Sequence, residues 1–132
     1  MTRPFIGNIS PFFIVEDVPA ALSFYRDRLS FEVTFQEPAH NPFFAIVNRD
    51  RAMIMMKSVE VKALPNCERD PAARWDAYVY VPDPDALAEE FTSRGVGFSV
   101  PLKNTHDGLR GFELEDADGY VLLFGRPRTE EP

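Results

Sequence analysis

The chain has 132 residues, of which 45% are hydrophobic and 13% aromatic, and its formal net charge is −7. This length and composition suit one compact domain around a single hydrophobic core, with no need for disulfides. The negative charge disfavours sequence-independent nucleic-acid binding, which depends on Lys and Arg neutralising phosphates. The single cysteine, Cys67, cannot form an intrachain disulfide, and no apolar stretch is long enough to span a bilayer. We therefore expect a cytoplasmic protein that binds neither nucleic acid nor membranes.

The first half of the chain predicts one strand, one helix and three further strands. The first strand is expected at residues 9–15. Asp17 and Pro19 predict the start of a helix, because Asp accepts hydrogen bonds from free N–H groups in the first turn and Pro needs no such bond. Apolar side chains at helical spacing continue to Leu29. Three strand-like runs follow, at residues 31–37, 43–47 and 52–56.

The second half repeats this order at an offset of 66 residues. Val15, Asp17, Ala20, Tyr25 and Arg28 correspond to Val81, Asp83, Ala86, Phe91 and Arg94. The second helix is expected to stop near Arg94, with Gly95 available for a left-handed cap. The strands of this half are expected at residues 77–81, 97–101, 109–115 and 120–124. The order βαβββ is thus predicted twice.

Neither half can close a core alone, so we expect one domain over residues 1–132. Module one covers about residues 5–57, a polar surface crossover residues 58–74, and module two about residues 75–126. Residues 127–132 are expected to form a tail.

Several segments resemble the vicinal oxygen chelate superfamily, which includes glyoxalase I, extradiol dioxygenases and bleomycin resistance proteins. The similarity is carried by residues 13–18, 21–25, 29–33 and 112–123 and extends over nearly the whole chain, with Ser30 where relatives usually have Gly. We favour the bleomycin-resistance-like branch. The resemblance implies an α+β fold in which two βαβββ modules form a curled eight-stranded mixed sheet around a ligand cup, with the helices outside.

In metal-dependent relatives, inward side chains on the first and last strands of each module hold the ion and are commonly His, Gln or Glu. The resemblance places Ser10, Met55, Asp76 and Leu123 at these positions. A thioether and an aliphatic chain supply almost nothing to a hard or borderline ion. We therefore expect no metal and no cofactor, and a small-molecule binding protein rather than an enzyme.

Side-chain alternation predicts what lines the cup instead. Pairing Val47 with Ala52 and Glu115 with Tyr120 across the two hairpins places aromatic and thioether groups inside. The expected ligand-binding residues are Ser10, Phe12, Phe44, Met53, Met55, Asp76, Tyr78, Tyr80, Arg110, Phe112 and Leu123. Such a lining suits an aromatic or cationic compound. Aromatic stripes also form ordinary cores, so a cup filled by its own side chains is an alternative.

The role of Asp76 and the function of the protein each allow an alternative. Asp76 is a candidate general base, a cation-binding group, or a structural partner of Arg74 or Arg110. The alternative function is a metal-dependent lyase, isomerase or dioxygenase whose replaced ligands would be Asp76, His40 and His106. The resemblance also implies a homodimer whose clefts include residues from both subunits.

Overall fold

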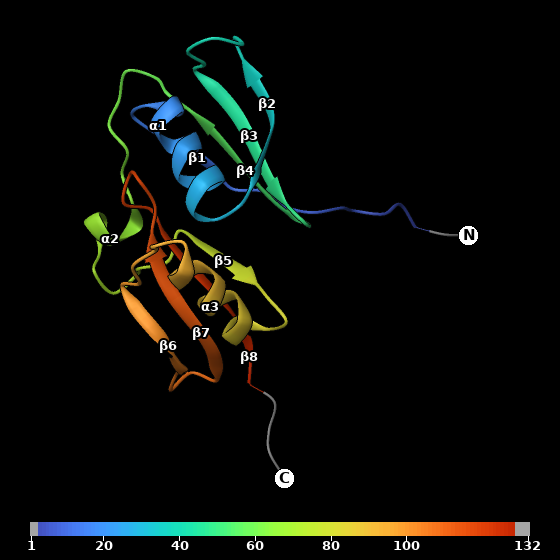
Figure 1. Ribbon diagram of the computed structural model, residues 1–132, viewed down its shortest axis with the longest axis vertical. Coiled ribbons are helices and arrows are strands. Elements are labelled where there is room, and N and C mark those ends of the chain that lie inside the picture. The colour runs from blue at the N-terminus through green and yellow to red at the C-terminus, as the bar shows by residue number, and fades with distance from the viewer. Residues whose placement is uncertain (1–2, 129–132) are drawn as a thin grey trace.

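The computed structural model describes residues 3–128. Its elements follow one another as β1 (Phe12–Ile14), α1 (Val18–Ser23), the π-helical turn η1 (Phe24–Arg28), β2 (Glu32–Glu37), β3 (Phe44–Arg49), β4 (Ala52–Lys57), α2 (Asn66–Arg69), β5 (Ala77–Tyr80), α3 (Pro84–Ser93), β6 (Val100–Asn104), β7 (Leu109–Glu115) and β8 (Val121–Pro127). The α+β fold and the two βαβββ modules are therefore confirmed (Figure 1). Within residues 3–128, no helix is both long and apolar enough to cross a bilayer.

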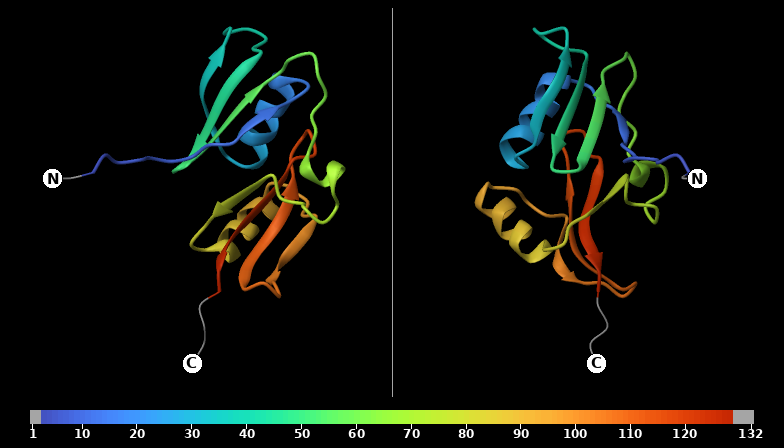
Figure 2. Two further views of the ribbon diagram at one scale, coloured as in Figure 1. Left: turned by 180° about the vertical axis from the view of Figure 1, so that it is seen from behind. Right: turned by 90° about the vertical axis from the view of Figure 1, so that its right-hand side faces the viewer.

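The eight strands divide into two four-stranded mixed sheets. Sheet one has the order β1-β4-β3-β2, and sheet two has the matching order β5-β8-β7-β6. In each sheet the first strand of the module runs parallel to the last, and the other neighbours are antiparallel. Both α1 and α3 lie on one side of the molecule, so that the uncovered faces of both sheets point to the other side (Figure 2, right). We call these two faces, which carry no helix α1 or α3, the open faces.

Both helix starts form as the sequence predicts. The Asp17 carboxylate accepts a hydrogen bond from the Ala20 amide at 3.2 Å, and the Asp83 carboxylate accepts one from the Ala86 amide at 3.1 Å. Each bond satisfies one of the amides that a first helical turn leaves unpaired. Gly95 follows α3 with a positive φ of 83°, the left-handed conformation expected for a helix cap.

The core lies between the helices and the covered faces of the sheets. On the module-two side, Phe91 of α3 is fully buried. Its ring meets the rings of Phe112 and Phe124 edge-on, with centroid distances of 5.9 and 5.4 Å. Edge-to-face aromatic packing of this kind adds to the free energy gained by burial. The helix therefore fixes which side of sheet two is covered.

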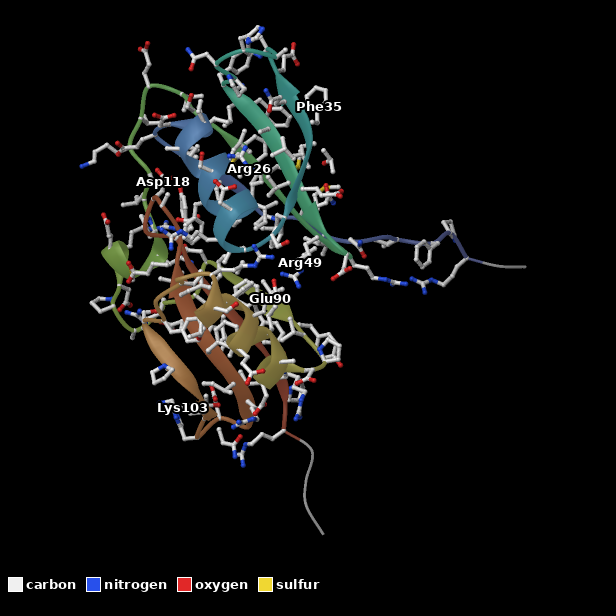
Figure 3. All side chains as sticks on the ribbon, in the orientation of Figure 1. Arg26, Phe35, Arg49, Glu90, Lys103 and Asp118 are labelled. Carbon is white, nitrogen blue, oxygen red and sulfur yellow. The ribbon has the colours of Figure 1, made fainter. Side chains whose placement is uncertain are left out.

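Polar contacts join the two modules. The Tyr25 hydroxyl donates to the buried Asp116 carboxylate at 2.6 Å. Arg28 donates to the Gly95 carbonyl at 3.0 Å, at the end of α3. Arg49 and Glu90 point toward one another across the junction (Figure 3) and form two hydrogen bonds of 2.9 and 2.8 Å. These contacts hold the modules in an arrangement that leaves both open faces uncovered.

The structure differs from expectation at both ends of the fold. The first strand was expected at residues 9–15, but β1 begins at Phe12. At its N-terminal end, the pairing with β4 stops at the hydrogen bond from the Met55 amide to the Pro11 carbonyl. Residues 3–11 leave the body as an extended arm on which Phe5 and Ile9 are each 92% exposed (Figure 1). β8 continues to Pro127, one residue into the expected tail, and residues 129–132 of that tail lie outside the described residues. The expected crossover contains the short helix α2.

Candidate functional site

The open face of sheet one is built from alternating residues on its four strands. Phe12 pairs in register with Met55, and Met55 pairs with Ile46. The residues between them in sequence, such as Phe13 and Met56, are buried on the helix side. The apolar side chains of this open face are Phe12, Ile14, Phe35, Phe44, Ile46, Met53 and Met55, and the register also places Asn48 and Lys57 on it. Aromatic rings and thioethers therefore dominate this surface, as the sequence predicts for this half.

The first hairpin is tighter than expected, but this changes no face. Arg49 pairs with Ala52 across a two-residue turn, whereas the sequence favoured Val47 opposite Ala52. Each residue of β3 therefore has a partner two positions from the predicted one, so side chains stay on their predicted faces. Phe44 lies on the same face as Met53 and Met55, and its ring contacts Phe12 at a centroid distance of 6.0 Å.

On sheet two, Tyr78, Tyr80 and Leu123 lie on the open face as predicted. Tyr78 pairs with Leu123 and Tyr80 with Gly125, while Val79 packs against the core. The Tyr78 hydroxyl donates to the Gly125 carbonyl at 3.3 Å. Partial burial, with a smaller effect from Tyr80, raises the pKa of Tyr78. The hydroxyl of Tyr78 therefore stays protonated and keeps this bond throughout the neutral range.

The predicted positions of Phe112 and Arg110 are wrong. Phe112 pairs with Phe124 and Glu115 with Val121, a register one residue away from the predicted one. A shift of one residue moves every side chain of β7 to the opposite face. Phe112 is consequently buried beneath α3, and Arg110 forms an ion pair with Asp85 at the start of α3, with a 2.7 Å bond. Neither side chain lines an open face.

Asp76 takes a structural role that the sequence left open. Its two carboxylate oxygens accept hydrogen bonds from the Asn66 and Val121 amides, each at 2.8 Å. The two arginines considered as partners bind other acids, because Arg74 pairs with Glu113 and Arg110 with Asp85. Asp76 thus fixes the end of the crossover to β8, and both its oxygens are engaged.

The four family metal positions do not fit a metal ion. Met55 and Leu123 offer a thioether and an aliphatic chain, the Asp76 oxygens are engaged by amides, and Ser10 lies in the arm before β1. Over residues 3–128, no three side chains of His, Cys, Asp or Glu converge as metal ligands would. His40 in the β2–β3 loop and His106 in the β6–β7 turn therefore do not meet Asp76.

The sequence interpretation missed two residues of sheet two. Glu113 is 3% exposed and lies on the open face, since it pairs with Leu123 across β7 and β8. Trp75, at the end of the crossover, stacks on Tyr78 with ring centroids 6.2 Å apart. The available signal for Glu113 was a carboxylate directly between Phe112 and Leu114 in the middle of a predicted strand. The position of Trp75 depends on how the crossover folds back, which periodicity does not reveal.

Two hollows border the open faces. One, of about 380 Å³, lies beside β1 and α2 and includes Phe12, Ile14 and Asp76 in its lining. The other, of about 610 Å³, lies at the module junction and reaches from Tyr80 to the buried rings of Phe91 and Phe124. Met53, Met55 and Tyr78 line neither hollow. Phe12, Tyr78 and Tyr80 are 54%, 42% and 61% exposed, so these rings lie on the surface of one chain.

Paired βαβββ modules with helices on one side and uncovered sheets on the other define the class of protein. A family model described as the Glyoxalase/Bleomycin resistance protein/Dioxygenase superfamily matches residues 7–124, and the chain belongs to this family.

Solved structures of similar proteins support the same fold. TioX from Micromonospora sp. ML1 has 19% identity and a TM-score of 0.72, covering 92% of this chain and 98% of that one. A bleomycin-binding protein from Streptomyces verticillus, complexed with copper(II)-bleomycin, has 27% identity and a TM-score of 0.69, covering 98% and 100%. TnmS3, an antibiotic binding protein from Streptomyces sp. CB03234, has 21% identity and a TM-score of 0.66, covering 95% and 99%. A search of curated proteins found no significant match.

Proposed function

We propose that this protein binds a small organic molecule, aromatic or cationic, on its open faces without a metal ion. The exposed rings of the open faces carry the proposal, since Phe12 is 54% and Tyr80 61% exposed. Large exposed apolar patches on soluble domains usually mark interaction sites. The bleomycin-binding protein with 27% identity supports small-molecule binding on this fold. Aromatic faces and thioethers suit flat rings and cations.

We infer that the binding form is a homodimer in the cytoplasm. The open faces of both sheets point to the same side, and only the part of sheet two around Glu113 and Leu123 is buried in one chain (Figure 2, right). A second copy placed face to face would therefore enclose the ligand. The exposed apolar side chains of the arm add surface for such an association. The lone thiol of Cys67 suits a reducing compartment.

Metal independence rests on the chemistry of the family positions. Met55 and Leu123 give no hard donor, and the Asp76 oxygens already accept two amide hydrogen bonds. An ion-dependent lyase, isomerase or dioxygenase would need at least three converging donors. We therefore expect binding to survive treatment with EDTA.

Replacing Tyr78 by Ala is expected to weaken ligand binding about tenfold, because stacking on its ring is lost. The measurement is the rise in Tm with a library of planar aromatic and quaternary ammonium compounds, before and after EDTA. For a compound that binds only the folded protein, this rise follows mass action. Light scattering on the same samples gives the mass of the assembly.

Arg26→Ala is the control, because Arg26 lies on η1 at the helix side and its side chain is 53% exposed (Figure 3). It should leave the rise in Tm unchanged. An equal ligand-dependent rise in Tm in wild type and Tyr78→Ala would contradict the proposal that the ligand binds on the open face of sheet two. Loss of binding after EDTA, restored by a stoichiometric ion, would show that the site needs a metal.

A further inference from the structure

Glu113 is an unusual residue for the middle of an apolar binding surface. Its side chain is 4% exposed, on the open face of sheet two. A buried carboxylate is unfavourable unless several donors satisfy its oxygens. Here Arg74 donates at 2.8 Å, Ser99 at 3.0 Å and the Trp75 indole at 3.2 Å. The carboxylate thus accepts hydrogen bonds from Ser99, directly before β6, and from Arg74 and Trp75 at the end of the crossover.

The charge of Glu113 is fully compensated. Burial alone raises the pKa of its carboxyl, but hydrogen bonds from Arg74 and Ser99, together with the charge of Arg74, outweigh burial and lower the pKa below its ordinary value. Arg74 is the charged group facing Glu113, and Glu115 and Cys67 lie near Arg74. At neutral pH the surface above Leu123 therefore holds an ion pair with no net charge.

The same carboxylate fixes the orientation of Trp75. With its indole N–H held by Glu113, the ring of Trp75 lies over Tyr78 with an interplanar angle of 27°. Trp75 and Tyr78 remain 37% and 42% exposed. Their polar atoms are occupied, since the Tyr78 hydroxyl donates to the Gly125 carbonyl. The two residues therefore present ring surface to a ligand, with no free donor.

We propose that Glu113 is a positioning residue of the ligand site, holding Trp75 against Tyr78 so that the two rings form a stacking platform for a planar aromatic ligand. The inference rests on the proposed function and narrows the ligand class to planar aromatic compounds. The two rings, at 27° to one another, offer contact area to a planar ring. A tetrahedral cation would touch only part of that area, and no unpaired carboxylate on the platform adds to its attraction to the rings. Stacking on protein aromatics tolerates varied ring systems, because every planar aromatic ring presents a π-face.

Trp75 is the only tryptophan of the chain, so its emission reports on the platform alone. Acridone, a neutral planar tricycle, and tetraethylammonium, a non-aromatic cation, are the probes. In wild type we expect acridone to quench Trp75 with a saturable curve that varies little with salt concentration, and tetraethylammonium to cause no change. In Glu113→Gln the ion pair is lost, so we expect a five- to tenfold higher Kd and Trp75 emission at longer wavelength.

Ser99→Ala removes one donor and is the milder variant if Glu113→Gln folds poorly; we expect a smaller rise in its Kd. Asp85→Asn is the matched control, because it breaks an Arg–carboxylate pair on the covered side of the same sheet. Without ligand, acidification of wild type should change Trp75 emission with a midpoint below the ordinary pKa of Glu. Glu113→Gln should lack this transition.

The outcomes separate the two proposals. If both folded variants bind acridone as wild type does and only lose thermal stability, Glu113 is merely structural and the inference falls. If tetraethylammonium binds and acridone does not, the ligand class is wrong while small-molecule binding stands. If no compound of either kind binds wild type, the proposed function itself fails. If Trp75 emission depends on protein concentration and not on acridone, a second copy covers the platform and the inference is overturned.

Discussion

Replacing Phe112 by Ala is expected to lower the free energy of unfolding by about 3–5 kcal/mol, the usual cost of removing a buried ring. Phe112 is fully buried, stacks on Phe124 at 5.5 Å and meets Phe91 edge-on. None of these contacts lies on an open face. Urea denaturation measures the loss of stability, and the folded variant should bind ligand as wild type does. Phe112→Leu is the milder form if the alanine variant does not fold.

Phe44→Ala is the comparison, because Phe44 is half-buried on the open face of sheet one. We expect it to cost about 1 kcal/mol of stability, since only part of the ring is buried. Ligand binding should weaken, in contrast to Phe112. A small stability loss in Phe112→Ala combined with lost binding would mean that Phe112 lines the site and that the register of β7 is one residue away from that described.

The stability of the protein is expected to depend on the ionisation of Asp116. Burial raises the pKa of this carboxyl to about 6, although hydrogen bonds from the Tyr25 hydroxyl and from two amides act in the opposite direction. The folded protein therefore binds a proton more tightly than the unfolded chain. The stabilisation from Asp116 is complete below the unfolded pKa of 3.8 and is lost as the pH rises through about 6.

A shift of about two pKa units corresponds to about 3 kcal/mol in all, of which about 2 kcal/mol is lost between pH 4 and pH 7. The measurement is the difference in unfolding free energy between wild type and Asp116→Asn at several pH values in that range. This difference should favour wild type more at pH 4 than at pH 7. Taking the difference cancels other titrating groups, among them Glu90 and Glu113, whose pKa values are lowered.

Tyr25→Phe tests the cause of the shift. The Tyr25 hydroxyl stabilises the charged carboxylate, so removing it should raise the pKa of Asp116 further and move the transition to higher pH. An unchanged transition would mean that this bond does not influence the titration. A difference between wild type and Asp116→Asn that is flat across pH would show that Asp116 is not perturbed.

The fold followed from signals that act locally. Asp17 and Asp83 start the helices through bonds to amides three residues on, and both bonds are present. Alternation along β3 and β4 placed Phe44, Met53 and Met55 on one face, and this survived an error in the turn because the register changed by two residues. In both cases the sequence within a few residues decides the outcome.

The register of the second hairpin, between β7 and β8, could not be predicted from strand alternation. The Asp116 side chain accepts from the Asp118 and Tyr120 amides, which lengthens the turn so that β8 begins at Val121. One extra turn residue reverses the faces of Phe112 and Glu113. The ion pair of the buried Glu113 with the part-exposed Arg74 joins residues 39 positions apart. A contact of that range depends on the path of the crossover, which hydrophobic periodicity does not encode.

The division of the strands into two separately bonded sheets affects how this scaffold can diversify. Each module keeps its own hydrogen-bond ladder, so no strand pairing joins the backbone of one open face to that of the other. The two open faces differ in chemistry: one carries sulfur and phenyl groups, the other phenols, an indole and a neutralised acid. In the proposed homodimer, two open faces of different chemistry would let a symmetric assembly recognise a ligand whose two sides differ. A substitution on one face would then change the recognition of one side of the ligand only.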